Sequence, residues 1–183
     1  MKKKPCIILG VTGGIACYKS ADLCSKLTAG GYDVFVVMTE NARKLISDRI
    51  FFTLSQNPVL FDLFETPDWR PGHVDLASRA DLFVTAPATA NFLGKLAQGI
   101  ADDALSTVAL TFRGPMLVAP AMNTMMLESP AVQANLALLK ERGVRFIGPE
   151  EGNLACGPGG RGRMSEVPAI LEAIRAILPP TEA

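Results

Sequence analysis

The chain has 183 residues, 49% of them hydrophobic and 20% charged, which excludes a disordered or fibrous protein and suits one domain. Its 18 basic and 18 acidic residues give a formal net charge of zero, which argues against a nucleic-acid-binding protein. No apolar run approaches the roughly 18 residues that a membrane span needs. Glycines and charged residues interrupt any signal-peptide core after the basic start, so we expect a cytoplasmic enzyme or binding protein.

Strands and helices alternate along the chain. Short apolar runs predict strands at residues 5–11, 32–38, 82–86, 115–119 and 144–148. Helical spacing and helix-stopping glycines predict helices at residues 16–29, 41–47, 88–97, 104–112, 130–142 and 167–178. Residues 50–64 are apolar but irregular, while 65–72 and 150–164 are rich in proline or glycine and are expected to be loops.

The strand pattern predicts the fold class. The strands lack the alternation of apolar and polar residues, as expected for strands that are covered on both faces. Alternating strands and helices then give a doubly wound parallel sheet of five or six strands, a Rossmann-like α/β fold with three α/β/α layers. Ligands of such folds bind beyond the carboxyl ends of the strands, so we expect the chemistry at the strand-to-helix turns.

Three of these turns carry small or polar residues. Gly13 and Gly14 follow the first strand, where they either let a phosphate approach the backbone or form only a tight turn. Glu40 follows the second strand, in the position of the acid that binds ribose in NAD-dependent enzymes, so a nicotinamide oxidoreductase stays open. Thr89 and Asn91, in the segment PATAN after the third strand, suit a planar cofactor or its phosphate.

Three further residues suggest catalysis. Pro120 and Asn123 open a further predicted helix directly after a strand, and Asn123 is there either an N-cap or a ligand contact. His73 is the only histidine and lies in a predicted Gly/Pro loop, with Asp75 as a natural partner to orient the imidazole. Cys156 lies in the glycine-rich loop, whereas the other three cysteines are expected to be buried free thiols, and no metal site is expected.

Five segments, taken together, resemble a known family. They are GVTGGIACYKSADL, VVMTENA, GHVDLASRADLFVTAPATANFLGKLAQGIADDALSTVAL, LVAPAMNTMMLESPAVQANLALLKERGV and NLACGPGGRGRM, and they cover nearly the whole chain in order. In them the chain is similar to the flavin-dependent cysteine decarboxylases, and most of all to the branch that acts on phosphopantothenoylcysteine. The resemblance implies a single FMN-binding decarboxylase domain over residues 1–183, with a substrate-covering loop at about 150–164 and a C-terminal helix.

The family pattern implies a role for each matching residue. The residues that it places against FMN are Gly13, Gly14, Thr39, Thr89, Asn91, Ser106 and Thr107. His73 matches the catalytic histidine of the family. Asn123 matches the residue that binds the substrate carboxylate, and the neighbouring Met122 is expected to contact the substrate as well. Cys156 matches the thiol of the covering loop that donates a proton.

Two features of the substrate region go beyond these matches. Arg161 and Arg163, in the loop around Cys156, either hold the substrate phosphate or are solvated charges. Leu127 stands where the family motif usually has a tryptophan.

The resemblance implies FMN-dependent conversion of 4′-phosphopantothenoylcysteine into 4′-phosphopantetheine in coenzyme A biosynthesis. Transient oxidation of the thiol-bearing carbon to a thioaldehyde supplies an electron sink for the loss of CO2, and the reduced flavin then returns the hydride. A proton from Cys156 would favour the saturated product over an enethiol. The alternatives are a related decarboxylase acting on peptidyl cysteine, an FMN-binding subunit without activity of its own, and the nicotinamide oxidoreductase.

The resemblance also implies partners. The family is homo-oligomeric, so we expect trimers with each flavin site at a subunit boundary, and dodecamers as the larger assembly. The family counterpart is the decarboxylase half of a bifunctional coenzyme A biosynthesis protein. A synthase, either as a further domain or as a separate protein, is therefore the expected protein partner.

Overall fold

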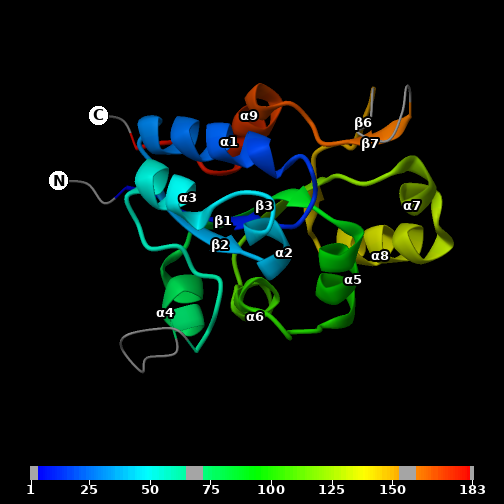
Figure 1. The fold of residues 1–183 in the computed structure, drawn as a ribbon, viewed down its shortest axis with the longest axis horizontal. Coiled ribbons are helices and arrows are strands. Elements are labelled where there is room, and N and C mark those ends of the chain that lie inside the picture. The colour runs from blue at the N-terminus through cyan, green and yellow to red at the C-terminus, as the bar shows by residue number, and fades with distance from the viewer. Residues whose placement is uncertain (1–3, 65–71, 153–159, 182–183) are drawn as a thin grey trace.

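A parallel five-stranded sheet forms the centre of the protein (Figure 1). The computed structural model describes residues 4–64, 72–152 and 160–181. The strand order is β2-β1-β3-β4-β5, and the strands are β1 (Cys6–Val11), β2 (Asp33–Met38), β3 (Leu82–Ala88), β4 (Met116–Pro120) and β5 (Arg145–Phe146). Every neighbouring pair in this sheet is parallel, so the predicted doubly wound parallel fold is confirmed.

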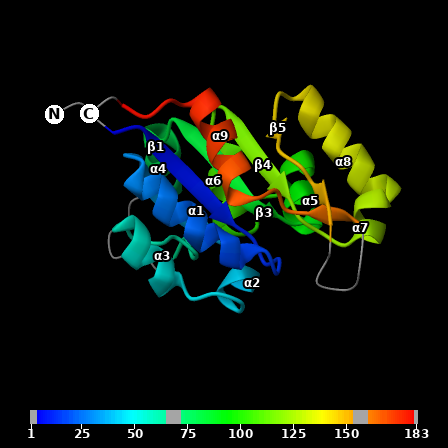
Figure 2. The same ribbon diagram turned by 90° about the horizontal axis from the view of Figure 1, so that it is seen from above.

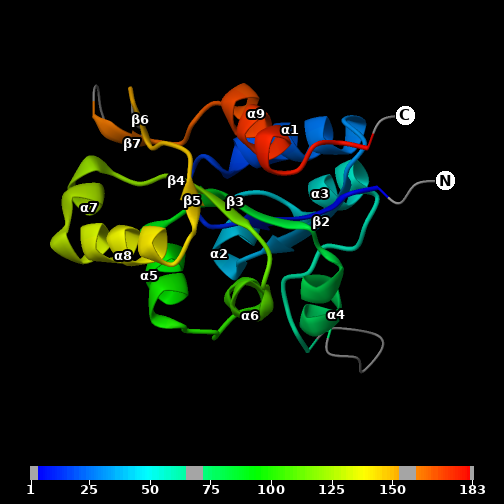
Figure 3. The same cartoon turned by 180° about the vertical axis from the view of Figure 1, so that it is seen from behind.

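Helices cover both faces of the sheet, with α1 and α9 on one face and α5, α6 and α8 on the other (Figures 1 and 3). The helices are α1 (Cys17–Ala29), α2 (Glu40–Arg43), α3 (Asp48–Ser55), α4 (Gly72–Arg79), α5 (Ala90–Gln98), α6 (Ala104–Thr111), α7 (Thr124–Glu128), α8 (Pro130–Glu141) and α9 (Val167–Ile177). Among the helices of the described ranges, none is long and apolar enough to cross a membrane.

The first strand explains why the sequence shows no alternation. Ile7 and Leu9 belong to the apolar core under α1 and α9, whereas Ile8 between them belongs to the core under α5 and α6. All three side chains are completely buried. Because both faces of the strand are covered, every position of β1 has to be apolar or small.

Two helices were missed by the sequence prediction. Helix α3 overlaps the start of the segment 50–64 that looked irregular, and its eight residues bury only Phe51 and Ser55, which is too few for a recognisable period. Helix α4 begins at Gly72, so the placement of His73 in a loop was wrong. The proline and glycine residues before this helix hid its start from the sequence pattern.

The predicted loop at 150–164 also contains regular structure. Strands β6 (Glu150–Glu151) and β7 (Arg161–Arg163) form an antiparallel pair. These strands are charged and very short, so the sequence has no apolar pattern that predicts them. An ion pair of 3.3 Å between Arg163 Nη2 and Glu150 Oε2 joins them.

Candidate active site

A cavity of about 750 Å³ lies at the carboxyl ends of the strands. The predicted site residues in its lining are Gly13, Gly14, Thr89, Met122, Asn123 and Arg163. They come from the turn after β1, the turn after β3, the segment after β4, and β7. The volume is that of a typical small-molecule site, and the position is the one where doubly wound sheets bind ligands.

Thr12 fixes the first two turns to each other. Its buried hydroxyl donates a hydrogen bond to the carbonyl of Pro87 at 2.7 Å and accepts one from the amide of Thr89 at 3.1 Å. Thr89 in turn caps α5, because its Oγ1 accepts a hydrogen bond from the amide of Phe92 at 3.4 Å. The sequence analysis missed Thr12, whose only signal is a polar residue between an apolar strand and two glycines.

Gly13 is required by close packing. A Cβ atom added at this position would lie 2.5 Å from Cβ of Asn41, which follows the first residue of α2. The absence of a side chain at Gly13 therefore lets the turn after β1 pack against the turn after β2. Gly14, beside it, borders the cavity together with Thr89.

Asn123 has two functions within one side chain. Its Oδ1 atom accepts a hydrogen bond of 2.8 Å from the amide of Met125, so Asn123 is the N-cap of α7, as one of the two alternatives predicted. Its Nδ2 atom has no acceptor among the described residues, and the side chain lines the cavity. The cap consumes the acceptor of the amide and leaves its N–H donors for a ligand that accepts hydrogen bonds, such as a carboxylate.

Ion pairs close one side of this cavity. Lys19 Nζ lies 2.9 Å from Glu166 Oε1, and the same carboxylate lies 3.4 Å from Arg163 Nη1. The hydrogen bond from Lys19 and the two nearby cations hold the pKa of Glu166 below its usual range. Arg163 also pairs with Glu150, so two carboxylates already neutralise its guanidinium. Arg163 therefore links β7 to β6 and to the start of α9.

Arg161 lies apart from Arg163. It does not line the large cavity but a second cavity of about 380 Å³, between the segment after β4, α8 and the end of β5. The two arginines, which the sequence analysis grouped either as ligands of the substrate phosphate or as solvated charges, thus face different spaces. Gly162 between them is buried.

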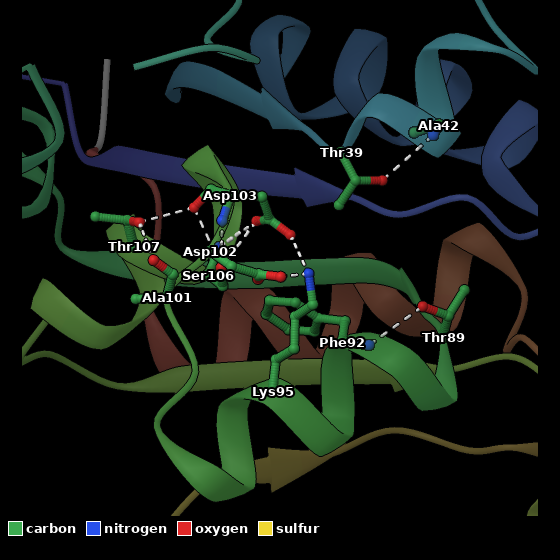
Figure 4. Close-up of polar contacts among 10 residues, drawn as sticks. All are labelled: Thr39, Ala42, Thr89, Phe92, Lys95, Ala101, Asp102, Asp103, Ser106 and Thr107. Atoms are coloured by element: carbon green, nitrogen blue, oxygen red, sulfur yellow. Dashed lines mark hydrogen bonds and ion pairs between the residues drawn. The ribbon is translucent and has the colours of Figure 1, made fainter. Parts of the chain in front are cut away.

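Three residues expected to contact FMN satisfy their polar groups within the chain (Figure 4). Thr39 is the N-cap of α2 and accepts a hydrogen bond from Ala42. Ser106 forms a capping box with Asp103, and Thr107 donates to the carbonyl of the same residue at 2.8 Å. None of the three borders the large cavity, and neither does Asn91, whose side chain is exposed.

Lys95 on α5 holds the start of α6 (Figure 4). Its Nζ atom lies 2.6 Å from Asp102 Oδ1 and 2.7 Å from Asp103 Oδ2. Burial alone would raise the pKa of Asp103, but the hydrogen bonds from Lys95 and Ser106 outweigh it and lower the pKa. The carboxylate of Asp103 therefore stays charged and fixes the first turn of α6.

His73 does not lie near Asn123 in this chain. Figures 1 and 2 show α4, which begins just before His73, at one end of the molecule, and α7, which follows Asn123, at the other. The expected partner of the imidazole is also engaged elsewhere, because Asp75 Oδ2 pairs with Arg79 at 3.3 Å. Cys156 lies outside the described residues.

Glu40 is not placed to bind a ribose in the large cavity. Its carboxylate pairs with Arg43 at 3.3 Å, and the residue borders a different, smaller hollow. Glu40, the residue on which the nicotinamide hypothesis depended, is thus paired within its own helix α2.

The cavity fits a flavin nucleotide. Helix α1 starts without a side-chain cap and without an acidic residue in its first turn, and Ile15 and Ala16 just before it line the cavity. The amides of Cys17 and Lys19 already donate to the carbonyls of Gly14 and Ala16, so it is the positive end of the helix dipole that suits a phosphate here. The exposed side chains of Ile15, Tyr18 and Met126 give the same cavity an apolar wall that suits a planar ring.

Comparison with known proteins decides the family. A family model described as Flavoprotein matches residues 1–178. This chain belongs to the flavoprotein family. A relative from Streptococcus mutans, described as a probable phosphopantothenoylcysteine decarboxylase, is 44% identical over 95% of this chain and 98% of its own length. The coenzyme A biosynthesis bifunctional protein CoaBC of Bacillus subtilis is 46% identical over 91% of this chain, which spans only 41% of that relative.

Solved flavoprotein structures share the fold. A PPC decarboxylase mutant complexed with pantothenoylaminoethenethiol superposes with a TM-score of 0.87 at 30% identity, over 95% of this chain and 98% of that one. The FMN-dependent cysteine decarboxylase SpaF superposes with a TM-score of 0.81 at 33% identity, over 95% of both chains.

Proposed function

We propose that this chain is an FMN-dependent decarboxylase that converts 4′-phosphopantothenoylcysteine into 4′-phosphopantetheine in coenzyme A biosynthesis. The observation that carries the proposal is the capped Asn123, whose amide lines the large cavity with its N–H donors free. The flavoprotein family and the full-length relative described as a probable phosphopantothenoylcysteine decarboxylase support the same reaction. The whole chain is then a single FMN-binding decarboxylase domain.

Bound FMN supplies a hydride acceptor that later returns the hydride, so the overall reaction is redox-neutral and exchanges CO2 for a proton. The N–H donors of Asn123 hold the substrate carboxylate in place. A neutral donor suits this task, because a cation would stabilise the charged ground state that has to be lost. Gly13, Gly14 and Thr89 line the space for the flavin, and Cys156 delivers the proton that completes the saturated product.

The separation of His73 and Asn123 within one chain supports an oligomer. In the proposed trimer each flavin site lies at a subunit boundary, where His73 of a neighbouring copy approaches Asn123 of this one. Thr39, Asn91, Ser106 and Thr107 then contact FMN from positions that complete the site at this boundary. A dodecamer is the larger assembly. The enzyme acts in the cytoplasm, and its protein partner is a synthase, linked or separate, as the bifunctional relative suggests.

Anaerobic turnover of phosphopantothenoylcysteine, with the mass of the product determined, tests the function. We expect CO2 release and the saturated aminothiol. An enethiol product would contradict the saturated product. Turnover of a peptidyl cysteine alone would favour the peptidyl-cysteine decarboxylase, and flavin binding without CO2 release would favour a subunit without activity of its own.

The Cys156→Ser variant separates the two halves of the reaction. A hydroxyl is far less acidic than a thiol with a pKa near 8.5, so it cannot donate the proton at a comparable rate. We expect CO2 release with reduced flavin and an enethiol, detected by anaerobic stopped-flow absorbance and product mass. Cys17→Ala, which removes a buried thiol of α1, is the control and should still give the saturated product. Saturated product from Cys156→Ser would contradict the role of Cys156.

A further inference from the structure

The second cavity borders the first through adjacent residues of the chain. Arg161 lines the second cavity while Gly162 and Arg163 line the first, and Leu127 lines the second while Met126 lines the first. A ligand that extends from the first cavity past these residues therefore reaches the second one.

The position of Arg161 relative to the first cavity is fixed by the backbone. The hydroxyl of Thr124 donates a hydrogen bond of 2.8 Å to the carbonyl of Arg161, and the amide of Met122 donates one of 3.0 Å to the carbonyl of Gly162. A Cβ atom on Gly162 would lie 2.1 Å from the carbonyl oxygen of Met122, so only glycine permits this approach. The backbone of Arg161 is thus held beside the segment that carries Asn123.

Two cations face the second cavity. The guanidinium of Arg161 has no hydrogen-bond or ion-pair partner among the described residues, in contrast to Arg163 with its two carboxylates. Lys140 of α8 lines the same cavity, with its Nζ atom 5.8 Å from the centre of the Phe146 ring. Glu128 is the one carboxylate in the lining, so the cavity keeps a net positive charge and suits an anion.

The rest of the lining is largely apolar. The apolar residues that border it are Pro120, Leu127, Leu136, Phe146 and Pro149. A ligand that fits this arrangement has a branched aliphatic body next to an anionic group. The phosphopantoyl end of the proposed substrate has this chemistry, because its phosphate ester adjoins a carbon that carries two methyl groups.

We propose that the second cavity binds the phosphopantoyl end of the substrate, with Arg161 and Lys140 holding the phosphate and the apolar lining holding the two methyl groups. The inference rests on the proposed function and divides the substrate between the two cavities. Asn123 holds the carboxylate in the first cavity, and Arg161 recognises the phosphate in the second. Arg163 then serves to position β7 and does not bind the phosphate.

Paired substrates test this inference in the FMN-loaded oligomer. The unmodified enzyme and its Arg161→Gln, Lys140→Gln and double variants are each assayed with two substrates. One is phosphopantothenoylcysteine, and the other is the same compound without the phosphate, pantothenoylcysteine. We expect kcat/KM for the phosphorylated substrate to fall by about tenfold or more in each single variant, through KM. The dephosphorylated substrate should lose little in any variant. Arg113→Gln, which removes an exposed arginine before β4 at the opposite ends of the strands, is the control.

Equal losses for both substrates, or no loss in the double variant, would overturn the inference. Binding of 4′-phosphopantothenate, measured by calorimetry against pantothenate, gives a second measurement that needs no turnover. If the unmodified enzyme decarboxylates neither substrate, the proposed function fails, and the calorimetry still decides the site. Phosphate-dependent binding that Arg161→Gln abolishes would support it, and binding that ignores the phosphate would overturn it.

Discussion

The expected site residues are distributed unevenly between the two ends of the molecule. At the carboxyl ends of the strands, Gly13, Gly14, Thr89 and Asn123 border one cavity. At the opposite end, helix α4 carries His73 with no second predicted catalytic residue beside it in the described part of the chain. If His73 takes part in the reaction, as proposed, a neighbouring copy of the chain has to bring it to Asn123.

The largest effect is expected at the cavity end. Asn123→Asp keeps an N-cap for α7, because Asp caps as well as Asn, but it replaces the N–H donors with a negative charge. The charge repels the substrate carboxylate, so we expect kcat/KM to fall by about a thousandfold or more. Flavin absorbance and the thermal unfolding midpoint should stay close to those of the unmodified protein.

A matched change on a neighbouring helix controls for added charge. Asn135 of α8 accepts a hydrogen bond from Gln98 on the surface, and an Asp in its place can accept the same bond. Asn135→Asp should therefore be active. Activity of Asn123→Asp close to that of this control would remove the carboxylate-binding role of Asn123.

A mixing experiment tests the opposite end. His73→Asn and Asn123→Asp should each be inactive alone, yet co-expressed with different tags they should regain activity in the mixed oligomer. Random assembly places an intact His73 against an intact Asn123 in about a quarter of the boundaries. A mixture of His73→Asn with His73→Ala is the control and should stay inactive. No recovery in the first mixture would contradict the shared site, and near-normal activity of His73→Asn alone would exclude His73 from catalysis.

The cavity end was predictable because topology brings the strand ends together. Gly13, Thr89 and Asn123 each follow a strand, and parallel strands end at one edge of a sheet. Thr12 was not predictable, since its two hydrogen-bond partners lie 75 and 77 residues away in the sequence. A polar side chain in a turn gives no sign of such distant partners.

Other features depend on packing that a linear pattern does not contain. The separation of His73 from Asn123 arises from the position of α4 beside α6 and not from any motif. The different surroundings of Arg161 and Arg163 depend on the close approach of Gly162 to Met122, which appears only when β7 is placed against the segment after β4. The candidate site residues were therefore easier to predict from the sequence than the residues that surround each of them in the fold.

The smallest change, one in stability, is expected for Asp103, which caps the start of α6. Its pKa is lowered in the folded protein, because hydrogen bonds from Lys95 and Ser106 outweigh burial. A lowered pKa means that the stabilisation is complete above the unfolded value of about 3.9 and is lost as the pH falls through the folded-state pKa. Asp103→Asn should therefore lower the free energy of unfolding by about 1 kcal/mol at pH 7, measured with urea, and the difference should shrink in acid.

Asp22→Asn serves as the comparison for Asp103→Asn, because its carboxylate pairs with Lys26 on the exposed face of α1. That exposed pair should contribute little at any pH. If Asp103 only supports α6, its variant should keep kcat while it loses stability. A loss of kcat with unchanged stability would instead indicate that Asp103 positions Ser106 and Thr107 for their proposed contact with FMN.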